Sequence, residues 1–317
     1  MEFGGPDVLR LVDLPVPEPG EGELLIRVDR AGLNFGDTHQ RRNEYIAKRG
    51  LPLVLGGEVA GTVERAAAGF AAGERVVALI ETGGYAEYAV APAERAFRIP
   101  DGVSDDEALA LLIQGLTAWH VLKTSARLQA GESVVVHSAA GGTGALIVQV
   151  ANAIGAGRVI ATAGSAERRE QALGLGADVA VDPDAGDLTA ALIDANEGRP
   201  LDAILDAAGG RVFEQSLAAL APFGRLVAYG NSTREKVAVT NGELLKASRA
   251  VIGFWLMHLL DRREMLEQPL AELFALAAAG EIGVRLGGTY PLSDVARTHE
   301  DLEARRTTGK LTLDPTR

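Results

Sequence analysis

A glycine-rich turn that reads SAAGGTG at residues 138–144 carries the clearest chemical signal in the sequence. At the start of a helix, unpaired N–H groups and a partial positive charge can bind a pyrophosphate without a dedicated cation. Gly141 lacks the Cβ that would hold a phosphate away from the backbone, and Gly144 lets helix and strand pack closely. The candidate phosphate-binding residues are Ala140, Gly141, Gly142, Thr143 and Gly144.

The segments that flank this turn have the patterns of a strand and a helix. Ser133 to His137 is a short β-branched apolar run, which indicates a buried parallel strand. Residues 145–156 carry apolar side chains at helical spacing. Strand, glycine turn and helix together form the context that a dinucleotide fingerprint requires. Because Ala139 replaces the first glycine, the match is A-x-G-x-x-G, and a plain strand-to-helix turn stays open as the alternative.

The tip of the next predicted strand, residues 158–163, indicates which dinucleotide would bind. A nicotinamide-binding fold normally places an acid there for the ribose 2′-OH. This chain has Gly164 and Ser165 instead, followed by Arg168 and Arg169 in the next helix. A 2′-phosphate, with about −1.5 to −2 charges, is repelled by a carboxylate and suits a hydroxyl and a guanidinium. We therefore expect NADP(H), with the two arginines as a solvated helix face as the alternative.

Composition limits the classes of function. The 317 residues are 47% hydrophobic and 23% charged, as in globular proteins of about two domains. A net charge of −12 argues against a nucleic acid or an anionic membrane as partner. The absence of cysteine excludes disulfides and thiolate zinc sites. No secretion signal is evident, and the most apolar segment, residues 251–260, is too short for a bilayer. We expect a cytoplasmic enzyme.

The hydrophobic period changes along the chain. Short alternating segments before Pro100 predict a compact, barrel-like β domain. These predicted strands are Glu23 to Leu33, Leu55 to Glu64, Glu74 to Ile80 and Gly84 to Val90. Ser104 and Glu107 predict a capping box for a helix to Leu112 that continues, with a break at Gly115, to Leu122.

The middle of the chain predicts a different architecture. Five strand-and-helix alternations begin at Val134, and a sixth strand follows at residues 250–254. This alternation predicts an α/β fold with a doubly wound parallel sheet. The strands and helices expected after Asp261 could complete the first domain.

Many segments together resemble the zinc-independent quinone oxidoreductases, the zeta-crystallin-like branch of the medium-chain dehydrogenase/reductase superfamily. The matching segments include AGLNFGDTHQRR at Ala31, LGGEVAGTVE at Leu55, QGLTAWHVL at Gln114, HSAAGGTGALIVQVA at His137, GLGADVAVD at Gly174 and TGKLTLDP at Thr308. Members usually begin with a further strand before EFGGPDVLRL, so we expect that a strand is missing here.

The resemblance implies a Rossmann domain inserted in a GroES-like catalytic domain, with a cleft between them. We expect the GroES-like domain at 1–112 and 257–317 and the Rossmann domain at 113–256. The resemblance also implies a homodimer formed through the last Rossmann strand, residues 250–254. A β-branched edge strand fits such pairing, although an ordinary buried edge is the alternative.

The resemblance also bears on metal binding. Zinc-dependent relatives have a Cys where this chain has Asn34 and a His where it has Gly57, so only Glu58 remains. Because a catalytic zinc needs about three protein ligands, we expect no metal. Glu58 is then expected to orient the glycine turn.

The family match supplies the catalytic candidates Asn34, Tyr45 and Thr117. Asn34 and Thr117 match positions that line the nicotinamide pocket, where they can hold the carboxamide or a substrate oxygen. Tyr45 matches a pocket tyrosine that could donate a hydrogen bond or proton to the substrate oxyanion. The alternatives are turn packing for Asn34 and a rim aromatic for Tyr45.

Three further positions match cofactor-binding sites of the family. Asn231 is expected at the carboxyl end of a strand, where ligands bind in such folds. Phe254 is expected to flank the cofactor, and Lys310 to contact a distal phosphate.

The resemblance implies NADPH-dependent reduction of a quinone without metal, on a small-molecule substrate. An enone or enoyl C=C reductase is the alternative within enzymes, since a conjugated carbonyl also stabilises an arriving negative charge. A protein that binds NADPH without turnover is the alternative from another class.

Overall fold

The computed structural model describes residues 2–317, which form two compact units. Unit 1 comprises the residues up to Gln114, Leu259–Ala278 and Val284–Arg317. Unit 2 comprises Gly115–His258 and Ala279–Gly283. Gln149 ties the second segment to unit 2, because its amide exchanges two hydrogen bonds with the backbone of Gly283, at 2.7 and 3.0 Å. No helix among residues 2–317 is long and apolar enough to cross a membrane.

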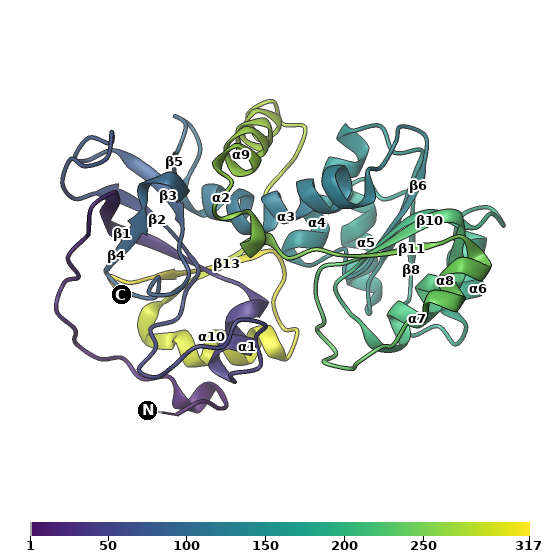
Figure 1. The fold of residues 1–317 in the computed structure, drawn as a ribbon, viewed down its shortest axis with the longest axis horizontal. Helices are drawn as coiled ribbons and strands as arrows, with labels where there is room; N and C mark the ends of the chain where they lie inside the picture. The colour runs from purple at the N-terminus through teal and green to yellow at the C-terminus, as the bar shows by residue number, and fades with distance from the viewer. Residues whose placement is uncertain (1) are drawn as a thin grey trace. The chain divides into compact units, whose positions relative to one another are not determined.

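Unit 1 is built on a mixed sheet to which both ends of the chain contribute (Figure 1). Its strands are β1 (Glu23–Leu33), β2 (Glu58–Val63), β3 (Arg75–Leu79), β4 (Tyr88–Pro92), β5 (Ala96–Arg98), β12 (Leu286–Pro291) and β13 (Lys310–Asp314). They follow the order β12-β13-β1-β2-β3-β5, with β4 paired to β1. The antiparallel pairing of β13 with β1 joins the tail of the chain to its first strands, as the family resemblance implied.

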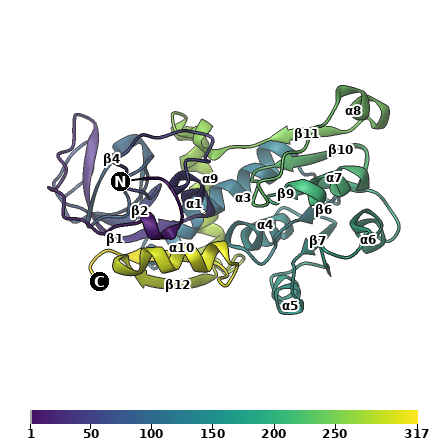
Figure 2. The ribbon, with the colours of Figure 1, turned by 90° about the horizontal axis from the view of Figure 1, so that it is seen from below.

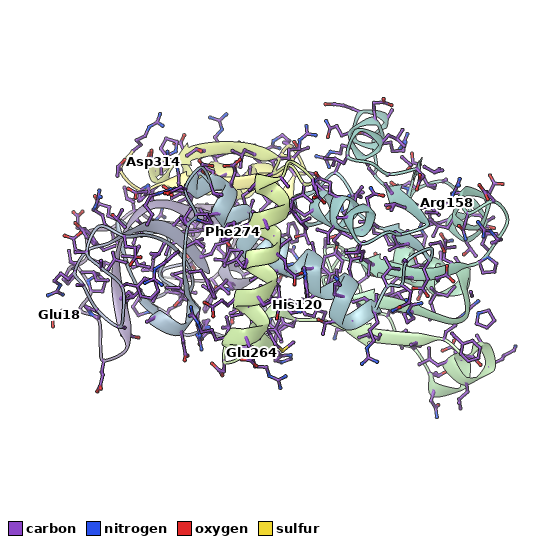
Figure 3. All side chains as sticks on the ribbon, turned by 90° about the horizontal axis from the view of Figure 1, so that it is seen from above. Glu18, His120, Arg158, Glu264, Phe274 and Asp314 are labelled. Atoms are coloured by element: carbon purple, nitrogen blue, oxygen red, sulfur yellow. The ribbon has the colours of Figure 1, made fainter. Side chains whose placement is uncertain are left out.

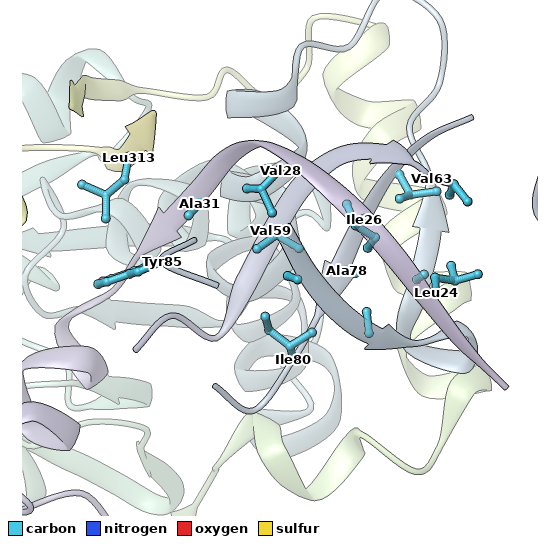
Figure 4. Close-up of a cluster of buried hydrophobic side chains, with 14 of the residues drawn as sticks. Leu24, Ile26, Val28, Ala31, Val59, Val63, Ala78, Ile80, Tyr85 and Leu313 are labelled. Atoms are coloured by element: carbon cyan, nitrogen blue, oxygen red, sulfur yellow. The ribbon is translucent and has the colours of Figure 1, made fainter. Parts of the chain in front are cut away.

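Alternating apolar residues of these strands form the core of unit 1. Leu24, Ile26 and Val28 of β1 point into one cluster with Val59 of β2 and Leu313 of β13 (Figure 4). Since neighbouring side chains along a strand point to opposite faces, this alternation buries one face of β1. The β-rich domain that the sequence predicted is confirmed, whereas the short strand β5 was not predicted.

The helices of unit 1 are α1 (Phe35–Arg41), α2 (Asp105–Leu109), α9 (Arg263–Ala278) and α10 (Val295–Glu303). Ser104 and Glu107 form the predicted capping box at the start of α2. After α2, π-helical η3 (Ala110–Gly115), α3 (Leu116–His120) and π-helical η4 (Val121–Ala126) follow without interruption. The break predicted at Gly115 is therefore wrong, because Gly115 has helical dihedral angles, with φ −66° and ψ −49°, between the buried residues Gln114 and Leu116. Short 3₁₀ segments are η1 (Pro6–Val8), η2 (Ala93–Arg95), η5 (Leu256–Leu259) and η6 (Leu292–Asp294).

Unit 2 contains the predicted parallel sheet, in the order β11-β10-β9-β6-β7-β8. Its strands are β6 (Ser133–Val136), β7 (Arg158–Thr162), β8 (Val179–Val181), β9 (Leu201–Asp206), β10 (Leu220–Ala228) and β11 (Ala250–Gly253). The helices are α4 (Gly142–Ala153), α5 (Ala166–Gly174), α6 (Leu188–Ala195), α7 (Gly210–Ala219) and α8 (Asn241–Ala247). Helices α4 and α5 cover one face of the sheet, and α6 and α7 cover the other (Figure 2). The prediction of a doubly wound α/β sheet is confirmed.

Candidate active site

The glycine turn of unit 2 joins the end of β6 to the start of α4. Gly141 is the exposed N-cap of α4, and no side chain among residues 2–317 caps this helix. A Cβ on Gly144 would meet the carbonyl oxygen of Ser138 at 2.3 Å, so no larger residue fits without moving the turn. The turn therefore leaves the first N–H groups of α4 to an external acceptor, which fits a bound phosphate.

The tip of β7 lies beside this turn, because Ala139 N–H donates to the carbonyl oxygen of Thr162 at 3.0 Å. A Cβ on Gly164 would meet no atom within 4 Å, so there is open space at the tip. Ser165 caps α5, where its hydroxyl oxygen accepts from Arg168 N–H at 3.3 Å. The Ser165 O–H can then still donate to a phosphate oxygen.

Two arginines lie in the first turn of α5. The Arg169 guanidinium bonds to Asp182 and to the carbonyl oxygen of Ala163, each at 2.9 Å. Arg168 is half-buried in the first turn of α5, on the same turn as Ser165. The alternative of a fully solvated helix face therefore does not describe Arg169, whose charge is balanced within unit 2.

A buried histidine, His137, directly precedes the glycine turn. His137 lies at the end of β6 and bonds to the hydroxyls of Thr162 at 2.9 Å and Ser216 at 2.7 Å. Burial lowers the pKa of His137, although the nearby charge of Asp206 opposes this effect. A neutral imidazole between two hydroxyls links β6, β7 and α7 without adding charge beneath the turn.

The other predicted residues of unit 2 lie on several elements. Asn231 follows β10 and braces its own loop, accepting from the Thr233 hydroxyl at 3.3 Å. Phe254 follows β11 and stacks on His120, with ring centroids 5.8 Å apart and an interplanar angle of 18°. Thr117 is half-buried in α3, three residues before His120.

In unit 1, Asn34 is held through both its backbone and its side chain. As the N-cap of α1, its N–H donates to Asp37 Oδ2 at 2.9 Å. Its Nδ2 donates to Glu58 Oε1 at 2.7 Å, and its Oδ1 accepts from Lys310 Nζ at 3.2 Å. Asn34 therefore has a defined orientation at the end of β1.

Lys310 forms an ion pair with Glu58, and both side chains are fully buried. This corrects the contact to a distal phosphate expected for Lys310, because its ammonium group is enclosed by partners within unit 1. The second carboxylate oxygen of Glu58 accepts from Ile113 N–H at 3.2 Å. A carboxylate already occupied by an ammonium group does not fit a zinc site, and residues 2–317 contain no group of three potential metal ligands.

A chain of buried hydrogen bonds, which the sequence did not reveal, ends at Asp37. Because a guanidinium can only donate, Arg41 Nη1 donates to His299 Nδ1 at 3.0 Å. His299 Nε2 then carries the proton that faces the Tyr85 oxygen at 3.4 Å. The Tyr85 hydroxyl donates to Asp37 Oδ2 at 2.9 Å. The chain connects α10 to α1, which lie side by side in Figure 1, and thereby anchors the helix that begins at Asn34.

Burial shifts the pKa values of Asp37 and His299 in this chain, whereas hydrogen bonds decide the pKa of Glu303, which bonds to Arg41. Burial raises the pKa of Asp37 to about 6, despite the hydrogen bonds from Asn34 and Tyr85. Burial and the charge of Arg41 lower the pKa of His299 to about 3. Burial alone would raise the pKa of Glu303, but hydrogen bonds from Arg41 and Arg42 lower it to about 2.

Tyr45 packs on the first turn of α1. A Cβ on Gly36 would meet the Tyr45 ring at 3.3 Å, so the ring lies against the helix backbone two residues after Asn34. The structure thus brings Tyr45 close to Asn34 within unit 1, and places Thr117 in unit 2.

A separate groove of unit 1, about 420 Å³ in volume, contains none of the predicted residues. It lies beside α9, where Phe274 is labelled in Figure 3. Its two arginines lie over aromatic rings, Arg98 over Phe70 at 4.6 Å and Arg263 over Phe97 at 5.1 Å. Both guanidinium groups are already paired with carboxylates, Arg98 with Glu74 and Arg263 with Glu267.

Two family models match the chain. Residues 20–101 match the alcohol dehydrogenase GroES-like domain, and residues 142–275 match the family described as zinc-binding dehydrogenase. Quinone oxidoreductase of Pseudomonas aeruginosa is 35% identical over 322 residues, covering 99% of this chain and 97% of that protein. Quinone oxidoreductase 1 of Escherichia coli is 34% identical over 321 residues, covering 99% and 98%.

Solved structures resemble the whole fold. A mycobacterial protein complexed with NADPH superposes with a TM-score of 0.93 at 40% identity, covering 99% of this chain and 98% of that one. Quinone oxidoreductase of Escherichia coli complexed with NADPH gives a TM-score of 0.93 at 34% identity, with the same coverage of 99% and 98%.

Proposed function

We propose a function for this chain from the premise that it belongs to the quinone oxidoreductase branch of the medium-chain dehydrogenase/reductase superfamily. Members of this branch are NAD(P)H oxidoreductases. Within it, we propose that this enzyme transfers a hydride from NADPH to a quinone without a metal ion. The observation that carries the proposal is the tip of β7, which offers open space at Gly164, the Ser165 hydroxyl and Arg168 in place of a carboxylate.

The proposed cofactor site divides NADPH between three groups of unit 2. The N–H groups at the start of α4 would hold the pyrophosphate. Ser165 and Arg168 would hold the 2′-phosphate, since a hydroxyl and a guanidinium donate to it without repulsion. Thr117, Asn231 and Phe254 would lie along the nicotinamide end. That NADPH accompanies two similar structures supports this assignment.

Bound NADPH would supply the hydride. The quinone takes up this hydride and one proton from the medium or from Tyr45, and is reduced to the hydroquinone while the nicotinamide is oxidised. Asn34 would hold the substrate oxygen on which negative charge develops, so no Lewis acid is required. Glu58 contributes no metal site, because its carboxylate already bonds to Lys310, Asn34 and Ile113.

We further propose that the enzyme is a homodimer joined through β11. This strand pairs only with β10, so its other edge is open among the described residues. Phe223 of β10 and Leu245 of α8, which are 80% and 76% exposed, lie near the start of β11, because Phe223 N–H bonds to the Ser248 carbonyl and Ser248 N–H bonds to the Leu245 carbonyl. An open edge with apolar neighbours favours pairing of identical strands. Analytical ultracentrifugation should find a dimer, and a monomer at all concentrations would refute this part.

The experiment that tests the function compares electron acceptors. Purified protein is mixed with NADPH and para-benzoquinone, and separately with NADPH and an enone, while the cofactor absorbance is followed. Oxidation with the quinone supports the proposal. Oxidation with the enone alone identifies a C=C reductase instead. Tight NADPH binding without any oxidation identifies a binding protein. Activity should survive chelators, and elemental analysis should find no stoichiometric zinc.

A further inference from the structure

Two buried charges directly behind Asn34 have no part in the hydride transfer described above. The side chains of Glu58 and Lys310 are each 0% exposed, and both contact the Asn34 amide. A buried ion pair is weak evidence for stability, because a well-packed apolar pair of similar size is often as stable. The position of the pair therefore suggests a role toward Asn34.

The chemistry of the two partners settles which way the amide points. A carboxylate only accepts hydrogen bonds, and an ammonium group only donates them. Nδ2 of Asn34 must therefore face Glu58, and Oδ1 must face Lys310, as observed at 2.7 and 3.2 Å. With the amide reversed, its N–H groups would face the ammonium group of Lys310, and its oxygen would face the carboxylate of Glu58.

The carboxylate that orients the amide is itself fixed. A Cβ on Gly32 would meet Glu58 Oε1 at 2.4 Å, so the carboxylate lies directly against the backbone of β1. Ile113 N–H, in the π-helical segment η3, holds the other oxygen at 3.2 Å. Neither Glu58 nor the amide that it orients can rotate without breaking these contacts.

We propose that Glu58 and Lys310 are positioning residues that fix Asn34 as a hydrogen-bond donor to the carbonyl oxygen of the substrate. One N–H of the amide remains beyond the bond to Glu58. The ammonium group on Oδ1 polarises the amide, which strengthens this N–H as a donor and weakens the oxygen as an acceptor. A preoriented N–H stabilises the oxyanion without reorganisation. This inference rests on the proposed function and specifies which substrate atom Asn34 meets.

The test removes the pair without leaving an unpaired charge. Glu58→Leu and Lys310→Met are combined, and Asn34→Ala is made in the native protein and in this double variant. Asn34→Ala alone should lower kcat/KM for the quinone by about 10²- to 10³-fold. Because the pair acts through Asn34, the double variant should itself lower kcat/KM by at least about thirtyfold, and it should leave the NADPH Kd within about threefold. Asn34→Ala should then add less than about threefold to the loss in the double variant.

An equal loss from Asn34→Ala in both backgrounds would overturn the proposal, because the pair would then not act through Asn34. A second readout does not need activity. In protein labelled with heavy nitrogen at asparagine, the Asn34 side-chain amide, assigned from its loss in Asn34→Ala, should show one slowly exchanging proton.

The double variant should move both amide signals to the positions of exposed asparagines. If the Asn34 signals were unchanged in the double variant, the positioning role would be refuted. A native enzyme that oxidised no NADPH with any quinone would instead refute the proposed function, while the amide signals would still decide the positioning role.

Discussion

The glycine turn region of unit 2 and the surroundings of Asn34 in unit 1 are built in opposite ways. The glycine turn and the tip of β7 in unit 2 present backbone N–H groups and open space, with no side chain capping α4 among residues 2–317. The surroundings of Asn34 in unit 1 are closed by buried side chains, with Glu58 and Lys310 on its amide and Asp37 on its backbone. In unit 2 the N–H groups at the start of α4 are left to a ligand. In unit 1 the donors around Asn34 form hydrogen bonds to other residues of the same unit.

This difference follows from the group that each region is proposed to hold. A phosphate brings its own charge and needs only donors, which the start of a helix supplies. A neutral carbonyl oxygen becomes charged only during the reaction, so its donor must be oriented beforehand. Buried charges can impose that orientation, at a cost in desolvation.

Breaking the closed region should have the largest effect on stability. Lys310→Met leaves Glu58 buried without its cation, which should cost about 3–5 kcal/mol of unfolding free energy. Urea unfolding measures this loss. The matched control adds Glu58→Leu, which should recover most of it. If Lys310→Met were as stable as the native protein, the description of Glu58 and Lys310 as a buried ion pair would be wrong.

Breaking the open region should cost less. Gly144→Ala places a Cβ 2.3 Å from the Ser138 carbonyl oxygen, so the turn must shift, at about 1–3 kcal/mol. NADPH affinity, measured by calorimetry, should fall about tenfold or more. Gly174→Ala, where a Cβ would meet nothing within 4 Å, is the control and should bind NADPH normally. Equal losses in both variants would show that the turn does not select glycine for this reason.

The charge at the tip of β7 should discriminate between cofactors. Arg168→Ala should weaken NADPH about tenfold, or about 1.4 kcal/mol, and change NADH little, because only NADPH carries the 2′-phosphate. Arg169→Ala is the comparison, and it should affect both cofactors alike, since Arg169 is held by Asp182. Parallel titrations with both cofactors measure this difference. Equal weakening by Arg168→Ala would remove the basis for NADPH.

The buried chain behind Asp37 should show as a pH dependence of stability. The pKa of His299 falls from 6.5 to about 3 on folding. Its contribution to the free energy of unfolding is therefore lost as the pH falls from about 6.5 to 3. The pKa of Asp37 rises from 3.8 to about 6 on folding. Its contribution to the free energy of unfolding therefore increases as the pH falls from about 6 to 3.8.

His299→Gln should therefore flatten the loss of stability on acidification, and Asp37→Asn should steepen it. Thermal unfolding between about pH 7 and 4 measures both slopes, with the exposed His258→Gln as control. Changes of the same sign in the two variants would contradict this description of the chain.

The open region could be predicted from the sequence, and the closed one could not. The glycine turn lies within seven consecutive residues, and the apolar periods on each side indicate its strand and helix. Lys310 and Glu58 are 252 positions apart, and Arg41 and His299 are 258 apart. No local pattern reports such contacts, because the sheet of unit 1 brings them together by pairing β13 with β1.

The error on Lys310 has the same origin. From the sequence, a lysine near the end of the chain matched a phosphate contact, and only its burial beside Glu58 shows what it binds. Asn34 itself was found through the family resemblance, but the orientation of its amide depends on partners that the sequence does not place.

The most direct test of the proposed function is a steady-state comparison of NADPH and NADH as hydride donors to para-benzoquinone. The proposal predicts that the protein oxidises NADPH with a kcat/KM at least about tenfold above that for NADH, as expected for a 2′-phosphate bound by Arg168. Equal values for the two cofactors, or no oxidation with any quinone, would contradict it.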